Sequence, residues 1–521
     1  MIDSPVLSIV LPLLGAFLLP VLMRVSLGLG LWVGPAILIY GGWILAQLAI
    51  DGSALPMSLG IGGFAPPLGI NLYIDQTALL FAFATQLLGL IFWPFQLDSD
   101  TPRRQSLMLL LVAASTGLAL SGDLFNLYVF YELVAVASFG LITASGRPAA
   151  HAATFRYLVL SGIGSVFTLL GIALLYSQTG TLNLAHLAEL APEQLNNKLG
   201  LTAFLLMLIG IGVKAELFPV NTWVPEVYAT ASHRLSAFLA GLVSKLAMLV
   251  ILRLLILVFH QPEALQIVLL LGILGVISGE LAAWRARDMR RMLAFSSIGQ
   301  LGMIFIALSL PDDRGLLAVL ALSLHHMIVK SGLFMLTDGW GGSLRKLKGL
   351  GKRAPFGSAL FVLFALSLVG MPPLPGFWAK FTLISELASQ SSSLYLIGLV
   401  VFLLATVVET SYLFRIAGWL YQQPDDSPVS EPPPRLGGLS LSTAGLFGAA
   451  LIAATLWIGP VGERLQAMAV QTRQVSLYID TVKPQLKQAA QASPDASAAA
   501  FDNRRLAASS CETCTPMGDE Q

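Results

Sequence analysis

The chain has 521 residues, of which 56% are hydrophobic and only 11% are charged, and its formal net charge is +1. Soluble domains carry roughly 25% charged residues, so a chain this apolar is expected to have the lipid bilayer as its solvent. The near-zero net charge gives no electrostatic basis for a nucleic-acid partner. The two cysteines, Cys511 and Cys514, are too few for an iron–sulfur cluster, which takes about four thiolates. We therefore expect no cofactor and no metal in this chain.

Apolar runs able to cross the hydrocarbon core need about 20 residues each, and the sequence contains fourteen of them. The first run follows an acidic rather than basic start and continues toward Met23, which favours a transmembrane helix over a cleaved signal peptide. The predicted spans are 5–23, 27–50, 75–97, 105–121, 123–145, 154–177, 199–219, 233–259, 264–284, 290–310, 315–337, 356–389, 394–421 and 437–459.

The predicted helices fall into an ordered set of units. Gly and Pro in 51–74 indicate an extended loop or hairpin at the surface, 461–491 favours a short surface helix, and the remaining tail is expected to be disordered. Two five-helix units are expected to be inverted repeats, because each contains an odd number of helices. The predicted boundaries are 1–104 for three helices with the loop, 105–259 and 260–421 for the repeats, 422–460 for a further helix and 461–521 for the polar tail.

Lysine and arginine residues predict the orientation of these helices. The loops on the side of the N-terminus, apart from the tail, contain only Lys198 and Arg314, whereas the opposite loops are rich in both residues. Positively charged loops face the cytoplasm. We therefore expect a multi-pass protein of the bacterial cytoplasmic (inner) membrane, with both termini on the outer, periplasmic side.

Charged side chains are expected deep inside six of the predicted spans. Each costs at least ~2.5–3.5 kcal/mol at the bilayer centre, so such residues are functional candidates. One buried lysine can instead be a snorkelling side chain or half of an ion pair. Several at a common depth indicate a proton relay, with Glu132 and Lys214 as the candidate switch pair. The six residues are Glu132, Lys214, Lys245, Lys330, Lys380 and Glu409.

Helix breaks lie beside two of these lysines. Gly210, Gly212 and Pro219 flank Lys214, and the segment 370–376 directly precedes Lys380. A single proline kink is common in a membrane helix, but interrupted helices also mark transport sites. We therefore expect the seventh and twelfth helices to be broken at the site.

Other polar residues are weaker candidates. His325 and His326 point about 100° apart on a helix, so they cannot easily share a metal, but one of them could pass protons, since His326 shares a face with Lys330. Glu216 and Glu386 are path residues or, as we favour, helix-end charges. Glu280 is interpreted as part of a membrane-interface cluster with the arginines that follow it. Cys511 and Cys514 are expected to have no role or to form a disulfide outside the membrane.

Four linked motifs give the chain a family resemblance over roughly residues 70–420. Together they resemble the D subunit of Mrp-type cation/proton antiporters, within the wider family of antiporter-like subunits of respiratory complex I and membrane-bound hydrogenases. The motifs are Ser121–Glu132, Lys214–Pro219 continuing through Trp223–Tyr228 to Ser236 and Lys245, His325–Lys330, and Gly370–Lys380.

The resemblance implies an all-α polytopic fold of fourteen helices, with inverted repeats at helices 4–8 and 9–13 and with broken helices 7 and 12. It also implies that Glu132 and Lys214 are essential for transport. The relay would continue through Lys245, Lys330 and Lys380, within a multi-subunit membrane assembly.

Three features depart from the family pattern. Asn221 stands where many relatives have histidine, and Glu409 lies outside the pattern. The tail is longer than that of the Mrp-type D subunit, yet too polar for the lateral helix of the largest complex I relative.

We therefore expect a proton-translocating subunit that works with other membrane subunits, exchanges a monovalent cation (Na+ or K+) for protons, and has no chemistry of its own. One alternative is a pump subunit of a complex I-like NADH-quinone oxidoreductase or membrane-bound hydrogenase. Others are a coupling subunit for uptake of another solute, and a structural scaffold whose buried charges only form ion pairs.

Overall fold

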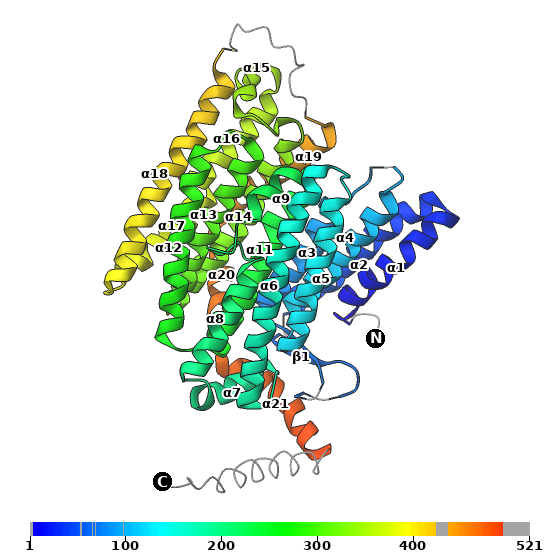
Figure 1. The fold of residues 1–521 in the computed structure, drawn as a ribbon, viewed down its shortest axis with the longest axis vertical. Coiled ribbons are helices and arrows are strands. Elements are labelled where there is room, and N and C mark those ends of the chain that lie inside the picture. The colour runs from blue at the N-terminus through cyan, green and yellow to red at the C-terminus, as the bar shows by residue number, and fades with distance from the viewer. Residues whose placement is uncertain are drawn as a thin grey trace, which may run out of the picture.

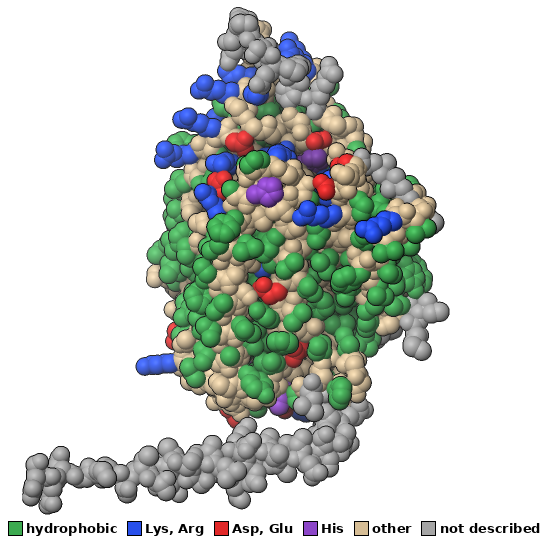
Figure 2. Space-filling model, turned by 45° about the vertical axis from the view of Figure 1, so that its right-hand side comes forward, with side chains coloured by type: hydrophobic (Ala, Val, Ile, Leu, Met, Phe, Trp, Pro, Cys, Tyr) green, Lys and Arg blue, Asp and Glu red, His purple; other side chains and the backbone are tan. Residues whose placement is uncertain are grey.

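The computed structural model describes residues 4–52, 55–64, 66–67, 69–96, 98–423 and 436–492, and it is almost entirely helical (Figure 1). The predicted cysteine pair and the last part of the tail lie outside these residues. The described chain forms one elongated bundle with α15 at one end and α7 and α21 at the other (Figure 1). Its outer face is largely hydrophobic, and lysine and arginine side chains gather toward the α15 end (Figure 2).

The N-terminal part pairs three helices with a small hairpin. Its elements are α1 (Leu7–Val25), α2 (Leu27–Asp51), β1 (Met57–Gly60), β2 (Asn71–Ile74) and α3 (Gln76–Ile91). The two strands are antiparallel, with Met57 opposite Ile74. A hairpin was one of the two predictions for 51–74, but its second strand is buried rather than at the surface. Asp75 follows that strand and caps α3 by accepting from the Ala78 amide at 2.7 Å.

The next group contains the first broken helix. Its elements are α4 (Thr101–Leu120), α5 (Leu124–Thr143), α6 (Pro148–Thr179), α7 (Leu184–Gln194), α8 (Lys198–Gly212), α9 (Val224–Thr230), α10 (His233–Phe238), the π-helix η1 (Leu239–Val243) and α11 (Ser244–Leu257). The very short connection between α4 and α5 is possible because Asp123 caps α5 directly, accepting from the Phe125 and Asn126 amides. The seventh predicted span, 199–219, is interrupted as expected: α8 ends at Gly212, and the next helix, α9, begins at Val224.

The second group contains the other break and is followed by the C-terminal helices. The elements are α12 (Pro262–Arg285), α13 (Met289–Leu308), α14 (Asp313–Trp340), the 3₁₀-helix η2 (Leu344–Leu347), α15 (Leu350–Arg353), α16 (Pro355–Val369), α17 (Pro375–Ser389), α18 (Ser393–Tyr421), α19 (Gly438–Leu456), α20 (Ile458–Arg473) and α21 (Val475–Ala492). The twelfth predicted span, 356–389, is broken between Val369 at the end of α16 and Pro375 at the start of α17, which confirms the second predicted break.

The lipid-facing surface follows from the exposed apolar side chains. Phe17, Phe155 and Val407 are each more than 60% exposed, although they lie within long apolar helices. In the described ranges, 10 helices are long and apolar enough to span a membrane, and shorter apolar helices include both α8 and α16. The chain is thus a multi-span membrane protein, and the number fourteen stays a prediction.

The C-terminal helices pack on the bundle rather than forming one short surface helix. The Tyr478 ring on α21 stacks on Tyr73 of β2 with centroids 3.7 Å apart. On α20, the Thr472 hydroxyl lies 2.7 Å from that of Thr77. These contacts connect residues about 400 positions apart in sequence, and the Tyr478 ring covers part of the buried strand.

Candidate functional site

The first predicted pair, Glu132 and Lys214, comes from α5 and from the irregular segment that follows α8. Lys214 follows α8 and is 1% exposed. Its ammonium donates to the Ser161 hydroxyl at 3.2 Å and lies 3.2 Å from the centroid of the Tyr131 ring. Glu132 is the residue after that tyrosine and interacts electrostatically with Lys214, although no ion pair within 4.0 Å joins them. Glu132 Oε1 is buried without a hydrogen-bond partner.

Side chains satisfy the backbone groups that the break releases. Tyr131 donates from its hydroxyl to the Gly210 carbonyl at 2.8 Å, and Trp223 Nε1 donates to the Val213 carbonyl at 2.8 Å. Asn221 donates from Nδ2 to the Glu216 carbonyl at 3.2 Å. Unpaired backbone groups are costly inside a membrane, so these contacts stabilise the irregular segment. Asn221, the departure from the family pattern, therefore has a structural contact here.

Lys245 and Lys330 form the centre of the site and are both fully buried. Lys245 follows the π-helix η1 and donates to the Ala240 carbonyl and, at 3.1 Å, to the Ser244 hydroxyl. Lys330 on α14 donates to the Ser296 hydroxyl at 2.6 Å. The two ammonium groups are close enough to repel each other. Single π-helical turns are frequent at functional sites, and this one sits directly before a buried charge.

The far end of the site is a direct ion pair. Lys380 Nζ on α17 lies 2.6 Å from Glu409 Oε2 on α18, and the two side chains are 5% and 0% exposed. Gln300 Nε2 on α13 donates to the other carboxylate oxygen at 2.7 Å. The six predicted charges are thus all buried or half-buried among packed helices. We call Glu132, Lys214, Lys245, Lys330, Lys380 and Glu409 the buried row.

The two histidines differ in their surroundings. His325 Nε2 lies 2.9 Å from the Ser367 hydroxyl on α16. His326 is fully buried, neither ring nitrogen has a hydrogen-bond partner, and it interacts electrostatically with Lys245 and Lys330. His325 lies within electrostatic range of Lys380 and Lys330, so both histidines are placed between members of the buried row and differ in their hydrogen bonding. In the described ranges, no three His, Cys, Asp or Glu side chains come together as metal ligands.

Two carboxylates for which the sequence favoured a helix-end or an interface position lie inside the bundle. Glu216 and Glu280 are each 1% exposed. The interpretation of Glu280 as an interface charge was wrong, because it faces Lys330 and Glu409 rather than the arginines that follow it. Glu386 does lie near a helix end, where it accepts from Ser389 and Gln390 side chains, away from the buried row.

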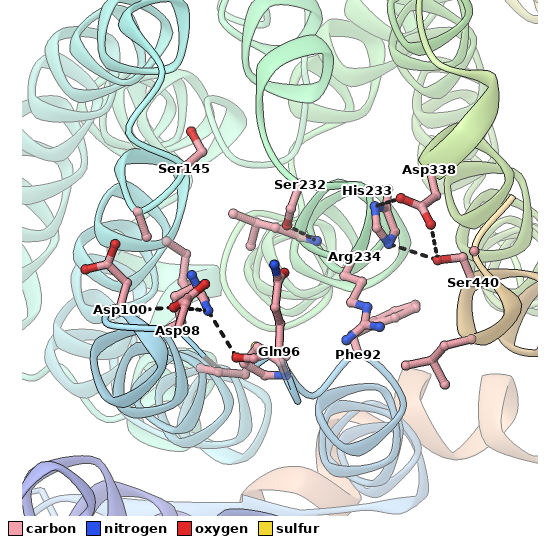
Figure 3. A pocket seen from close by; sticks show the side chains of 18 of the residues that line it. Phe92, Gln96, Asp98, Asp100, Ser145, Ser232, His233, Arg234, Asp338 and Ser440 are labelled. Carbon is pink, nitrogen blue, oxygen red and sulfur yellow. Dashed lines mark hydrogen bonds and ion pairs between the residues drawn. The ribbon is translucent and has the colours of Figure 1, made fainter. Parts of the chain in front are cut away.

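A polar cleft opens at the α15 end of the same helices. It has a volume of about 680 Å³ and is lined by the α3–α4 connection and by the ends of α5, α10, α14 and α19. His233 Nδ1 lies 3.2 Å from Asp338 Oδ1, and the Ser440 hydroxyl donates to Asp338 Oδ2 at 2.6 Å (Figure 3). His233 and Lys245 lie on the contiguous helical segment α10–η1–α11, and Asp338 and Lys330 both lie on α14. The cleft therefore opens above the centre of the buried row.

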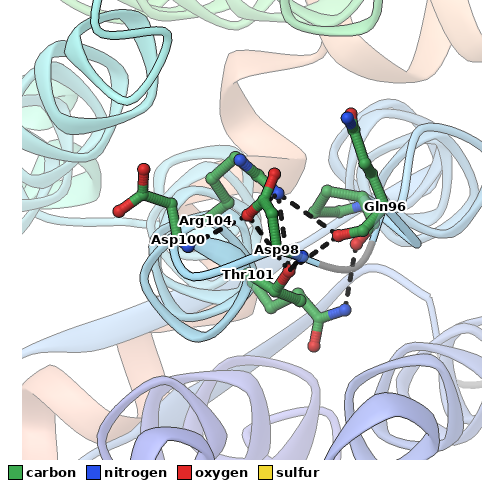
Figure 4. Close-up of polar contacts among 7 residues, drawn as sticks. Gln96, Asp98, Asp100, Thr101 and Arg104 are labelled. Atoms are coloured by element: carbon green, nitrogen blue, oxygen red, sulfur yellow. Dashed lines mark hydrogen bonds and ion pairs between the residues drawn. The ribbon is translucent and has the colours of Figure 1, made fainter.

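One wall of the cleft is held by a compact ion pair. Arg104 Nη2 lies 2.6 Å from Asp98 Oδ1, and the Asp98 amide donates to the Thr101 hydroxyl at 2.8 Å (Figure 4). The hydrogen bond from Arg104 lowers the pKa of Asp98 below its usual value. The carboxylate therefore stays ionised over the physiological range and fixes the connection that borders the cleft.

Comparisons with known proteins agree with this geometry. Residues 121–408 match the family described as NADH:quinone oxidoreductase/Mrp antiporter, TM. The chain is 34% identical over 433 residues to NADH-quinone oxidoreductase subunit N of Desulforudis audaxviator, covering 79% of this chain and 85% of the relative. It is 32% identical over 394 residues to the Na(+)/H(+) antiporter D subunit of Bacillus subtilis, covering 72% of this chain and 79% of that relative.

Solved structures of two membrane complexes contain chains with the same fold. A chain of the membrane-bound sulfane sulfur reductase, an archaeal respiratory membrane complex, matches with a TM-score of 0.84 and 31% identity, over 92% of this chain and 100% of that one. A chain of the Mrp complex from Dietzia sp. matches with a TM-score of 0.81 and 26% identity, over 92% and 99%. By sequence and fold, the chain belongs to the NADH:quinone oxidoreductase/Mrp antiporter transmembrane family, as an antiporter-like membrane subunit.

Proposed function

We propose that this chain is the proton-translocating subunit of a multi-subunit membrane complex that exchanges a monovalent cation, Na+ or K+, for protons. The observation that carries this proposal is the buried row, which runs from α5 to α18 through both helix breaks. Charges are expensive in a bilayer, and side chains that served only packing would be apolar. Support also comes from the Bacillus subtilis relative, which is named as the D subunit of a Na(+)/H(+) antiporter.

The proposed mechanism passes protons along the buried row. Glu132 and Lys214 form the switch. The Lys214 ammonium contacts the Ser161 hydroxyl and the Tyr131 ring directly and is attracted to Glu132 only at longer range, so it would release its proton more readily than an ammonium in a direct ion pair. Lys245 and Lys330 lie within electrostatic range of each other and would carry the proton through the centre of the row. Lys380 would close the path, its proton being retained by Glu409.

Access to the row would be through the polar cleft. Its position above Lys245 and Lys330 and its volume, large enough for many waters, support this role. In the proposed orientation the α15 end faces the cytoplasm, because positively charged loops are retained there. The chain would then lie in the bacterial inner membrane with both termini outside.

The proposed domain organisation keeps the sequence boundaries. The repeats at 105–259 and 260–421 would each contribute one broken helix and its lysine to the row. The three N-terminal helices and the exposed apolar faces of α1 and α2 would face lipid or other membrane subunits of the same complex. Relatives in this family are named as subunits, which supports partners of this kind.

A second candidate is a pump subunit of a redox-driven complex. It is favoured by the identity to NADH-quinone oxidoreductase subunit N and by the match to an archaeal respiratory membrane complex. The same buried row would then be driven by chemistry in other subunits.

The deciding experiment uses everted vesicles from an antiporter-deficient host that expresses the whole complex. Respiration loads the lumen with protons, a pH-sensitive dye reports the gradient, and NaCl or KCl is then added. The variants are wild type, Glu132→Gln and the matched control Glu189→Gln, which changes an exposed carboxylate on α7 paired with Lys483.

We expect the cation to discharge the gradient in wild type and in the control but not in Glu132→Gln. Full exchange by Glu132→Gln would contradict the proposal. If neither cation acts in wild type, while a redox substrate builds a gradient that Glu132→Gln weakens, the redox-driven pump is the correct function.

A further inference from the structure

Glu216 and Glu280 are two buried carboxylates that the relay described above does not use. Each is 1% exposed and lies beside lysines of the buried row. An ionised carboxylate inside the bundle is costly unless it is paired. Their positions must therefore be explained by the charges around them.

The backbone at Glu216 turns this side chain inward. Its φ of 57° lies in the left-handed region, and no other non-glycine residue in the described ranges has a positive φ. Such a conformation costs about 1–3 kcal/mol and persists only where its surroundings impose it. It lets Oε1 accept a hydrogen bond from the Tyr228 hydroxyl at 2.7 Å and brings the carboxylate within electrostatic range of Lys245 and Lys330.

The other side of Glu216 leads back to the first pair. Oε2 is buried and the Ser297 hydroxyl lies beside this carboxylate, but the two groups do not have the geometry of a hydrogen bond. Tyr157 stacks on Trp223, its hydroxyl also lacks a partner, and it interacts with both Glu132 and Glu216. The groups between the switch and the central lysines can thus donate or accept hydrogen bonds that they do not make in this conformation.

Glu280 repeats the arrangement in the second half. Oε2 accepts from the Tyr412 hydroxyl at 3.0 Å, and Oε1 is buried without a partner. Lys330 and Lys380 both attract this carboxylate, and Glu409 repels it. In each half, one carboxylate oxygen is held by a tyrosine, the other is free, and lysines lie within electrostatic range.

Charge balance links these residues to transport. Without them, the row contains Lys214, Lys245, Lys330 and Lys380 against only two carboxylates, an excess of positive charge that hydrocarbon disfavours. Glu216 and Glu280 bring the two signs into balance. A proton that leaves a lysine in this row is therefore attracted to the nearest of these carboxylates.

On the basis of the proposed function, we propose that Glu216 and Glu280 are proton-carrying members of the row, which pass protons between the lysines around them. In each step a lysine ammonium gives its proton to the carboxylate, leaving a neutral amine and a carboxylic acid. The acid then gives the proton to the next amine, and the ammonium–carboxylate pair forms again. Tyr228 and Tyr412 are positioning residues, which hold one oxygen so that the other faces the path.

The test uses the vesicle assay on the whole complex with Glu216→Gln and Glu280→Gln. The matched control is Glu226→Gln, which removes a carboxylate ion-paired with Arg291 near the membrane surface, ten residues after Glu216. Blue native gels report assembly, and the initial exchange rate is measured from pH 6 to 9. Wild type and Glu132→Gln are assayed in the same preparation.

We expect both substitutions to lower the exchange rate by about tenfold or more, with normal assembly, while the control behaves as wild type. If wild type exchanges, Glu132→Gln does not, and Glu216→Gln and Glu280→Gln match wild type, this inference is wrong and the proposed function stands. If wild type itself shows no exchange, the proposed function fails instead.

Glutamine variants that do not assemble are replaced by Glu216→Asp and Glu280→Asp, which keep the charge but shorten the side chain by one methylene. A proton carrier moved in this way is expected to change the pH at half-maximal rate. A purely structural charge would leave the pH profile as in wild type, and that result would overturn the inference.

Discussion

The ion pair between Lys380 and Glu409 allows transport and stability to be separated. Its atoms are 2.6 Å apart and its side chains are 5% and 0% exposed. Removing one partner of such a pair costs about 3–5 kcal/mol, because the other charge is left buried and unpaired. Glu409→Leu should therefore lower the melting temperature of the complex strongly, and it also leaves the amide of Gln300 without its acceptor.

Removing both charges should reverse most of this loss. In Lys380→Met with Glu409→Leu, no charge remains unpaired, and the remaining cost is the lost hydrogen bond of Gln300, about 1–3 kcal/mol. The expected order of melting temperature is wild type, then the double variant, then Glu409→Leu. Exchange should be absent in both variants, because each lacks Glu409, and the double variant also lacks Lys380.

Thermal melting of the purified complex in detergent and the vesicle assay measure the two properties. The matched control is Glu189→Leu, which breaks an exposed pair with Lys483 and should cost about 1 kcal/mol or less. Wild-type exchange by the double variant would refute a transport role for this pair. An unchanged melting temperature for Glu409→Leu would show that the stability argument is wrong.

Three further predictions follow from other contacts. Arg253→Leu leaves the buried carboxylate of Asp75, 2.6 Å from the guanidinium, unpaired, and should cost about 3–5 kcal/mol, measured as a lower melting temperature. Burial and a hydrogen bond with Glu386 raise the pKa of Asp312 to about 6, above the 3.8 of the unfolded chain, so its contribution to stability should fall as pH rises from about 4 to 6. The same hydrogen bond lowers the pKa of Glu386, which offsets part of this effect, and screening keeps the net change below about 1 kcal/mol. Melting curves of wild type and Asp312→Asn at pH 4 and 6 measure it. Ser161→Ala removes the hydroxyl that accepts from Lys214 and should shift the pH profile of exchange in vesicles, with the complex still assembled.

The buried lysines could be identified from the sequence because their depth in the membrane follows directly from their position within an apolar run. A residue about ten positions into a 20-residue apolar run must lie deep in the membrane. The breaks were also predictable, since glycine and proline interrupt helices by known mechanisms. These local signals do not depend on how the helices pack.

For Glu216 the sequence left two interpretations open and favoured the helix-end charge, because its buried position depends on irregular backbone. Between Gly212 and Val224 there is no helical period from which a direction could be predicted, and the inward turn depends on a φ of 57°. Distance from the helix end alone suggested a surface charge. Only contacts with distant residues such as Tyr228 fix its direction.

Glu280 was missed for a different reason, although a signal was present. Gly279 on α12 packs against the backbone of Gly299 on α13, and Gly272 against Gly302, so the two helices approach closely along a glycine-lined face. Small residues at such spacing mark helix–helix interfaces in membranes. A carboxylate beside that face is turned toward the neighbouring helix, not toward the membrane surface.

The two ends of the buried row differ in a way that limits how transport can be driven. Lys214 makes direct contacts only with neutral groups and interacts with Glu132 at longer range, whereas Lys380 is bound directly to a carboxylate. Moving one charge across 100 mV yields about 2.3 kcal/mol, which is less than the roughly 3–5 kcal/mol needed to leave one partner of a buried pair alone. A membrane potential of about 100 mV acting on one charge therefore supplies too little free energy to separate this ion pair. A proton arriving nearby, at Lys330 or Glu280, must weaken the pair electrostatically, so release at the α17 end is expected to depend on loading at the centre of the row.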